Sequence, residues 1–216
     1  MIESKITKHM KRTTLKGLAF LATAFLLIAI STQSCSTSHT WTPNEEALIN
    51  DAPGTKMRLW TIDNAEDSIF LRQPSQPLTQ ADIQQPIFEL LKERMLLTVT
   101  DPENEGVGIA APQVGIGRQV VAVQRFDKPE QPFEFYVNPR LTYLSDEKQK
   151  GWEGCLSVPN QRGEVMRSKQ VVVTFNHPNT FELQCDTIEG FTAIIFQHEI
   201  DHLSGTLYID KAETLK

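Results

Sequence analysis

The stretch Gln197-His198-Glu199-Ile200-Asp201-His202, near the C-terminus, decides how the rest of this 216-residue chain is interpreted. On a helix, positions four apart lie on one face, so His198 and His202 can direct two imidazoles at one metal ion. Glu199 follows the first histidine, where its carboxylate can reach a water held by that metal. A catalytic divalent metal also needs a third protein ligand and an open position. The stretch therefore predicts a metal-binding helix and a further ligand elsewhere.

A candidate third ligand is Cys155, in the segment Gly151-Trp-Glu-Gly-Cys155-Leu-Ser-Val-Pro159. The neighbouring glycine and proline place this cysteine in a constrained bend. A thiolate and two histidines form a three-ligand catalytic site. The chain has only two other cysteines, Cys35 and Cys185, which is too few for a disulfide scaffold. We expect Cys185 to be a small buried residue of a strand.

The segment Gly106-Val-Gly-Ile-Ala-Ala-Pro-Gln113 contains two glycines two residues apart. Such a pair permits a tight structural loop, or lets the backbone approach another group closely. It is not a dinucleotide fingerprint, because a third glycine is missing and Pro112 would interrupt the helix that must follow. Gln113 is the member that can take part in chemistry, as an amide donor to an oxyanion.

The segments Gly106 to Gln113, Glu153 to Ser157 and Gln197 to His202 together resemble the peptide deformylase family. They stand in the order and spacing of that family's three sequence blocks, and the resemblance extends from about Leu59 to Asp210. It implies an α+β fold in which antiparallel sheets wrap around a C-terminal metal-binding helix. It also implies an enzyme that removes the formyl group from N-formylmethionyl peptides and releases formate.

The resemblance implies a role for each matching residue. Cys155, His198 and His202 would bind one divalent metal per chain, with Glu199 as general base and acid. Ferrous iron is the usual metal in the family, with nickel, cobalt or zinc as alternatives. Gln113 and the backbone N–H of Leu156 would form the oxyanion hole.

The resemblance also implies a set of substrate-binding residues. The backbone at Val107, Gly108 and Gly154 would pair with an extended peptide, and Arg162 would contact the peptide further along. The pocket for the first side chain would be lined by Val107, Phe191, Ile194, Ile195 and His198. Two departures from the family pattern concern the pocket: Asn160 replaces a glycine, and Phe191 stands where leucine is usual.

The rest of the domain shows alternating strand and helix patterns. Apolar residues recur at three- and four-residue intervals from Thr79 to Thr98, which predicts an amphipathic helix with Thr79 as a possible cap. Runs rich in β-branched and aromatic residues predict extended segments at 58–62, 68–71, 119–124, 134–138, 169–175 and 180–186.

The N-terminus carries the pattern of an export signal. Five basic residues and one acidic residue precede the uncharged run Leu18 to Ile30, which is short for a membrane-spanning helix. Ser34-Cys35 follows, as at the lipidation site of bacterial lipoproteins. We therefore predict a signal peptide at 1–34, lipidation of Cys35, a flexible tether at 35–57 and a catalytic domain at 58–216. Met10 is an alternative start.

These features predict an exported protein held at the membrane of a bacterial cell envelope by its N-terminal lipid or anchor. The protein would be cytoplasmic if the N-terminus is not a functional signal. The chain has a net charge of −6, and its first 34 residues are basic, so the remainder is more acidic still. A surface of this charge is unsuited to nucleic acid. We expect a monomer.

Two alternatives to deformylase activity stay open at this point. An exported metallohydrolase could act on another small acyl amide with the same catalytic residues. A surface lipoprotein could instead bind formyl peptides or metal without turnover, but such a binder would not require Glu199.

Overall fold

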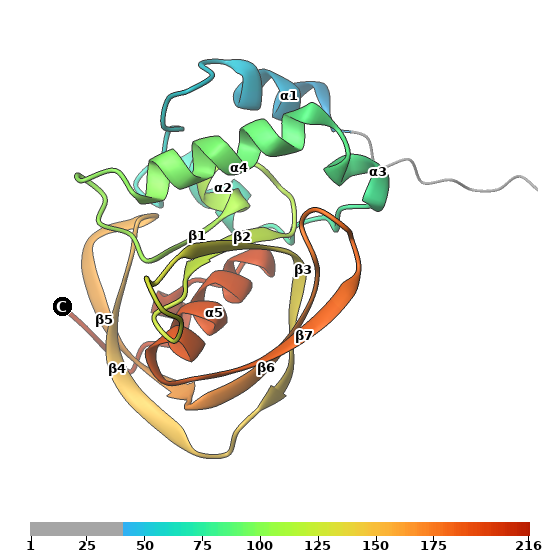
Figure 1. The fold of residues 1–216 in the computed structure, drawn as a ribbon. Coiled ribbons are helices and arrows are strands. Elements are labelled where there is room, and N and C mark those ends of the chain that lie inside the picture. Colours follow the sequence, from blue (N-terminus) through green and yellow to red (C-terminus); the bar gives the residue numbers. More distant parts are fainter. Residues whose placement is uncertain (1–40) are drawn as a thin grey trace, which may run out of the picture. The chain divides into compact units, whose positions relative to one another are not determined.

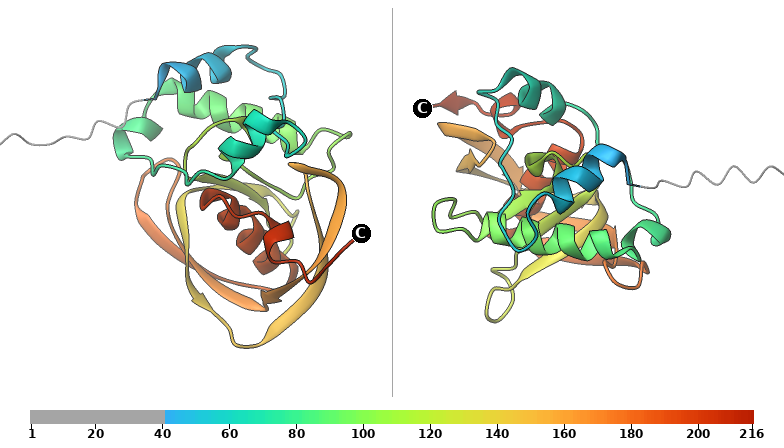
Figure 2. Two further views of the ribbon diagram at one scale, coloured as in Figure 1. Left: turned by 180° about the vertical axis from the view of Figure 1, so that it is seen from behind. Right: turned by 90° about the horizontal axis from the view of Figure 1, so that it is seen from above.

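The computed structural model describes residues 41–216, and in this range the fold is built around the C-terminal helix α5 (Gly190–Leu203). Figure 1 shows α5 enclosed by strands, with α1 (Pro43–Asn50) and α4 (Pro86–Val99) in a separate layer beyond β1 (Gly108–Ala110) and β2 (Val120–Gln124). The two further views in Figure 2 show the same arrangement from behind and from above. The predicted α+β fold, with antiparallel sheets around a C-terminal helix, is confirmed.

The larger sheet has five antiparallel strands in the order β1-β2-β3-β6-β7, where β3 is Phe133–Leu144, β6 is Gln170–Asn176 and β7 is Leu183–Glu189. Its inner face packs on α5; Tyr136, for example, meets Phe196 edge to face, with ring centroids 4.8 Å apart. The predicted strands near 119, 134, 169 and 180 are all present. They are β2, β3, β6 and β7, whereas β1 was not among the predicted strands.

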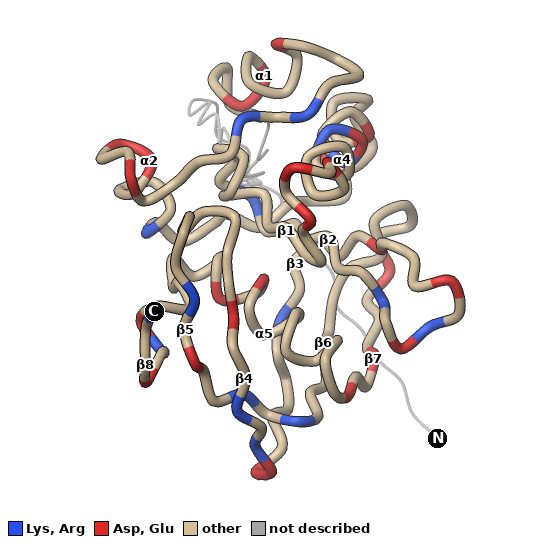
Figure 3. The backbone as a smooth tube through the Cα atoms, turned by 90° about the vertical axis from the view of Figure 1, so that its left-hand side faces the viewer, with Lys and Arg blue, Asp and Glu red and all other residues tan. Residues whose placement is uncertain are grey.

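The smaller sheet consists of the antiparallel strands β4 (Lys148–Cys155), β5 (Val158–Ser168) and β8 (Thr214–Leu215). Figure 3 shows α5 between β4 on one side and β6 on the other. The hairpin of β4 and β5 was not among the predicted strands, because the inner face of β4 carries Gln149, Gly151 and Glu153 in place of apolar residues. Cys155 is the last residue of β4, next to the turn, as the expected bend required.

The predicted helix from Thr79 to Thr98 is two helices, α3 (Gln80–Ile83) and α4 (Pro86–Val99). Thr79 caps α3 as expected, in a capping box with Asp82. Proline has no N–H to donate and is tolerated only in the first turn of a helix, so Pro86 ends one helix and begins the next.

The prediction of a flexible tether at 35–57 is wrong for residues 41–57. Pro43–Asn50 form the helix α1, and Thr42 caps it through a capping box with Glu45. Trp41 and Ile49 are buried in the same core cluster as the apolar face of α4, and Arg94 of α4 donates to the carbonyl groups of Leu48 and Ile49 in the last turn of α1. This segment is therefore an integral part of the domain.

A buried ion pair also fastens α1. Glu45 accepts two hydrogen bonds of 2.7 Å from the guanidinium of Arg118, which precedes β2. Both side chains are at least 90% buried, and the Arg118 guanidinium lies over the Trp41 ring. If α1 docked elsewhere, one of these two charges would be buried without its partner, which is unfavourable. The contact therefore specifies where α1 docks.

Three local predictions are also wrong. Residues 58–62 form no strand; instead, single backbone hydrogen bonds join Trp60 to Gln113 and Ile62 to Ser157. The segment at 68–71 belongs to the helix α2 (Ala65–Leu71), which Asn64 caps. Cys185 is exposed, because it lies on the outward face of β7.

The predicted signal peptide at 1–34 and the lipidation site at Cys35 lie outside the described residues. Within residues 41–216, none of the helices has the length and apolar character that crossing a membrane requires.

Candidate active site

Among the polar side chains that the helix α5 directs into the interior are His198, Glu199 and His202. His198 and His202 lie on one face, as their four-residue spacing predicts, with ring centroids 5.1 Å apart. Glu199 lies between them in the chain and is also buried. Two histidines in an apolar core need polar partners, which Cys155 and Glu153 on β4 supply.

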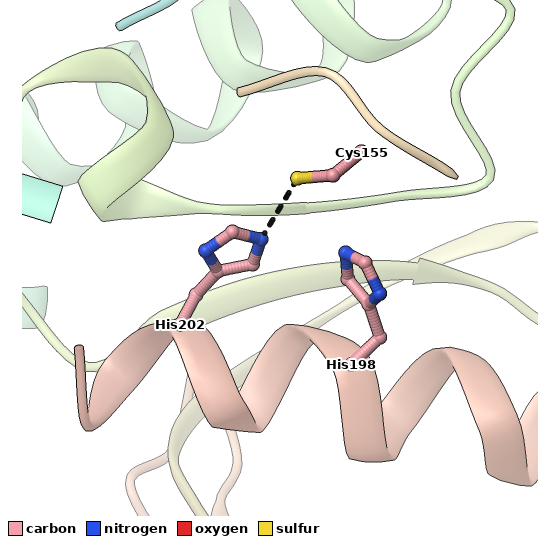
Figure 4. A group of neighbouring side chains, drawn as sticks. All are labelled: Cys155, His198 and His202. Carbon is pink, nitrogen blue, oxygen red and sulfur yellow. Dashed lines mark hydrogen bonds between the residues drawn. The ribbon is translucent and has the colours of Figure 1, made fainter. Parts of the chain in front are cut away.

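Cys155 approaches α5 from the end of β4. Its Sγ lies 3.2 Å from His202 Nε2, the contact drawn in Figure 4. The ligand atoms of Cys155, His198 and His202 all lie within 4.8 Å of one another. Gln113 Nε2 and the Ser157 N–H each donate to the sulfur at 3.4 Å. Both N–H groups are directed at the sulfur, which as a thiolate is a common metal ligand.

The donor set fits a divalent metal. His198 Nδ1 is 2.8 Å from a carboxylate oxygen of Glu153, so Nδ1 carries the proton and Nε2 is free to coordinate. Two imidazoles and one thiolate are donors suited to zinc or iron, with a position left open. Glu199 Oε2 is buried without a hydrogen-bond partner among the described residues, as expected of a carboxylate that serves a water or a substrate.

A cavity of about 890 Å³ opens in front of this group. Its size is at the upper end of the usual range for ligand sites. Every residue that the sequence suggested for substrate binding lines it: Val107, Gly108, Gly154, Arg162, Phe191, Ile194 and Ile195. Gln113, Cys155, Leu156, His198 and Glu199 line the same cavity. The fold therefore brings the predicted site residues together.

Gly108 shows what the double-glycine loop approaches. A Cβ atom at this position would lie 2.5 Å from Glu199 Oε1 and 2.8 Å from Ile195. Such distances are shorter than any van der Waals contact, so only glycine lets β1 pass this close to α5. The nearby Gln113 amide is also fixed, because its Oε1 accepts a 2.8 Å bond from the Ala110 N–H. Its NH₂ group is thereby turned towards Cys155.

The family profile described as Polypeptide deformylase matches residues 60–216 of this chain. The chain belongs to the peptide deformylase family. Family membership confirms the resemblance stated from the sequence and makes the chain a formyl-removing metallohydrolase. Among similar proteins, a peptide deformylase of Leptospira biflexa is 39% identical over 154 residues, which cover 68% of this chain and 84% of the Leptospira protein. A peptide deformylase of Natranaerobius thermophilus is 42% identical over 123 residues, which cover 56% of this chain and 76% of the Natranaerobius protein.

Solved peptide deformylase structures share the fold. The enzyme of Acinetobacter baumannii with bound Met-Ala-Ser superposes with a TM-score of 0.64 at 33% identity, covering 73% of this chain and 98% of that one. The Thermotoga maritima enzyme superposes with a TM-score of 0.63 at 30% identity, and the match covers 74% of this chain and 99% of the Thermotoga chain. The family match begins after α1, so this helix lies N-terminal to the matched residues.

In this peptide deformylase, a row of charged side chains supports the metal site from the Nδ1 side of the His198 ring. Glu153 receives 2.7 Å and 2.9 Å hydrogen bonds from Arg167 in addition to its contact with His198. Arg167 also donates to Asp201 at 2.6 Å, and Lys211 contacts the same carboxylate. This network fixes the orientation of the His198 ring from the side opposite its metal-facing nitrogen.

Burial and hydrogen bonding give two carboxyl groups of the site, Glu153 and Glu199, different pKa values. Burial acts to raise the pKa of Glu153, but hydrogen bonds from Arg167 and His198 outweigh it and lower the pKa to about 2. Glu199 has no such donors, so burial raises its pKa to about 7. One carboxylate therefore stays ionised as a support, and the other can exchange a proton near neutral pH.

Glu153 and Arg167 are the site residues to which the sequence analysis gave no role. One signal for Glu153 is available in hindsight: it stands two residues before Cys155, so on a strand both point to the same face. Nothing local marks Arg167, because its partners Glu153 and Asp201 lie 14 and 34 residues away in the chain.

Proposed function

We propose that this deformylase removes the formyl group from N-formylmethionyl peptides, with Glu199 as general base and acid. The observation that carries the proposal is the placement of Glu199, buried and without a partner for Oε2, beside the Cys155–His198–His202 group at the cavity. The peptide class is supported by the Met-Ala-Ser bound to the A. baumannii relative. A binder without turnover is disfavoured, because it would have no use for this carboxylate.

Cys155, His198 and His202 would hold the metal, which when bound acts as a Lewis acid and brings the pKa of a water towards neutrality. Glu199 then takes a proton from the attacking water. It passes a proton to the amide nitrogen as the C–N bond breaks, so that formate and a free amine leave. Its pKa of about 7 suits both transfers.

The oxygen of the formyl group gains negative charge during the attack. Gln113 offers its NH₂ group from a fixed position, and the backbone N–H of Leu156 is the second proposed donor. Each such donor is worth about 3 kcal/mol in comparable oxyanion holes. The backbone at Val107, Gly108 and Gly154 would pair with the peptide, and Arg162 would meet its later residues.

The decisive experiment is a formate-release assay on formyl-Met-Ala-Ser with the full-length, metal-loaded chain. The variant Glu199→Ala should lower kcat by about 10²–10⁴-fold, because proton transfer is lost. Metal analysis of the same samples should give equal occupancy in both proteins, which excludes a loss of metal as the cause. Absence of turnover by the unmodified chain with iron, nickel and zinc would overturn the proposal.

We further propose ferrous iron as the metal in the cell, with nickel, cobalt and zinc as replacements. The support is the mixed donor set, in which a thiolate joins two imidazoles, because all four metals bind such ligands. Metal analysis of protein isolated without oxygen tests this. Iron at about one ion per chain is the expected result, and stoichiometric zinc would contradict it.

We also propose that the chain is exported, lipidated at Cys35 and active as a membrane-held monomer on N-formyl peptides outside the cytoplasm. The basic region, the apolar run and the cysteine occur in the order of a lipoprotein signal. One chain supplies all the site residues, which supports a monomer. Mass spectrometry of the membrane-bound protein should find residue 35 as a lipidated N-terminus, and Cys35→Ser should release the protein from the membrane. An intact N-terminus in the cytosolic fraction would exclude export.

A further inference from the structure

The strand β4 presents a glycine to the interior where a side chain would be expected. Gly151 pairs across the hairpin with Val165, which is buried and lines the cavity. Residues directly opposite in an antiparallel pair point to the same face, so position 151 also faces inward. Its neighbours on that face, Gln149 and Glu153, both reach α5.

These two neighbours set the register between β4 and α5. Gln149 donates to the carbonyl of Gly190, and Glu153 bonds His198. The four residue steps from Gln149 to Glu153 span about 13 Å along the strand. The eight residue steps from Gly190 to His198 span about 12 Å along the helix. The two elements therefore run side by side over nearly the same length. Position 151, midway along the strand segment, therefore lies opposite the middle of the helical segment, at Ile194.

Space remains between these two positions. A Cβ atom added at Gly151 would meet no atom within 4 Å, and the backbone there has no left-handed φ that would require glycine. Gly151 and Ile194 both line the cavity, and Ile194 is only partly buried. The missing side chain thus widens the cavity between β4 and α5.

The next turn of α5 gives this widened region an aromatic wall. Phe191 lines the cavity and is 53% exposed, although it is a large apolar residue. Its ring is held from behind by Phe126, with centroids 5.1 Å apart and planes tilted by 57°. Phe126 lies between Arg125 and Asp127, which are joined by two hydrogen bonds of 2.6 and 2.8 Å. An exposed ring supported in this way is a surface on which another aromatic ring can pack edge to face.

We propose that Gly151 determines specificity, by opening the first-side-chain pocket towards Phe191 so that it accepts an aromatic first residue as well as methionine. The inference rests on the proposed function, since it concerns the substrate of the same site. A formyl-phenylalanyl peptide would place its ring in the space beside Gly151, against Phe191 and Ile194. Methionine would leave part of that space unfilled.

The test compares formyl-Phe-Ala-Ser with formyl-Met-Ala-Ser on the nickel-loaded, full-length chain and its variant Gly151→Ile. The unmodified chain should process the two peptides with kcat/KM values within about tenfold of each other. The isoleucine fills the space, so it should lower kcat/KM for the phenylalanyl peptide at least about 30-fold more than for the methionyl peptide. Isoleucine favours strands, so the variant should fold at least as well as the parent.

A matched control is Met166→Ile, which places the same side chain on the outward face of the same hairpin, where Met166 is exposed. It should leave both kcat/KM values unchanged. An unmodified chain that processes the methionyl peptide at least a thousandfold better would overturn the inference while the proposed function stands. Equal losses on both peptides in Gly151→Ile would overturn it as well.

Failure of the proposed function would give a different result, in which neither formyl peptide releases formate. The inference is then decided by binding, measured by calorimetry with Phe-Ala-Ser and Met-Ala-Ser. Selective loss of Phe-Ala-Ser affinity in Gly151→Ile would support the widened pocket. Unchanged relative affinity, or no binding of Phe-Ala-Ser by the unmodified chain, would overturn it.

Discussion

At the scale of single residues, Glu153 is the support on which His198 depends. We expect Glu153→Gln to weaken metal binding about 10–100-fold, because the neutral amide holds the imidazole less strongly and leaves Arg167 with one partner fewer. Competition with a chelator of known affinity measures the change. Glu164→Gln, on the outward face of the same hairpin, is the control and should bind metal as the parent does. Equal affinities in Glu153→Gln would show that the carboxylate does not hold the ligand.

Gly108 tests how the close approach of β1 to α5 positions the general base. In Gly108→Ala the new methyl group would occupy space now held by Glu199 Oε1 and Ile195, so the carboxylate must move. A displacement of about 1 Å in such a site reduces rates by about 100-fold, and we expect a loss of that order in kcat. The control is Gly117→Ala, where the nearest atom, from Phe70, would be 3.7 Å away, an ordinary contact. A fully active Gly108→Ala enzyme would contradict the close approach.

At the scale of secondary-structure elements, α1 offers a test of whether the N-terminal segment belongs to the domain. Ile49 is completely buried against α4, so Ile49→Ala should lower the free energy of unfolding by about 2–5 kcal/mol. Urea denaturation measures this loss. Glu46→Ala, at an exposed position of the same helix, should stay within about 0.5 kcal/mol of the parent. Similar stabilities for the two variants would mean that α1 is not docked in solution.

The elements also show what the sequence could and could not predict. The helix α5 follows from the four-residue spacing of its histidines, and the strands β2 and β6 follow from their runs of β-branched residues. The three motif segments converge on one cavity because each carries its own chemistry. The segment containing α1 has a polar composition with Pro and Gly, which indicates a tether. Its order comes from Arg94 and Arg118, which lie more than 40 residues further along the chain. Contacts of this range leave no periodic signal in a single sequence.

At the scale of the whole molecule, buried ion pairs join elements that are distant in the chain. Arg125 at the end of β2 is one centre, because it contacts Asp127, Glu134 and Asp186 and thereby joins β2, β3 and β7. The hydrogen bonds that Arg125 donates to Asp127 are the main cause that lowers the pKa of this carboxyl to about 2. The folded protein therefore releases this proton more readily than the unfolded chain does.

This difference in proton affinity determines how stability depends on pH. A carboxyl whose pKa is lower in the folded state stabilises the fold above its unfolded pKa of about 4, and this contribution is lost as pH falls towards 2. We expect the urea midpoint to fall between about pH 5 and pH 2, and to fall less steeply in Asp127→Asn, which has no proton to bind there. Glu46→Gln, at its exposed position, should reproduce the parental curve. If Asp127→Asn retained the full parental slope, the Arg125 cluster would not link folding to pH. The acid sensitivity of the fold would then have to come from other ion pairs. One such pair is Glu153 with Arg167, because the pKa of Glu153 is also lowered to about 2.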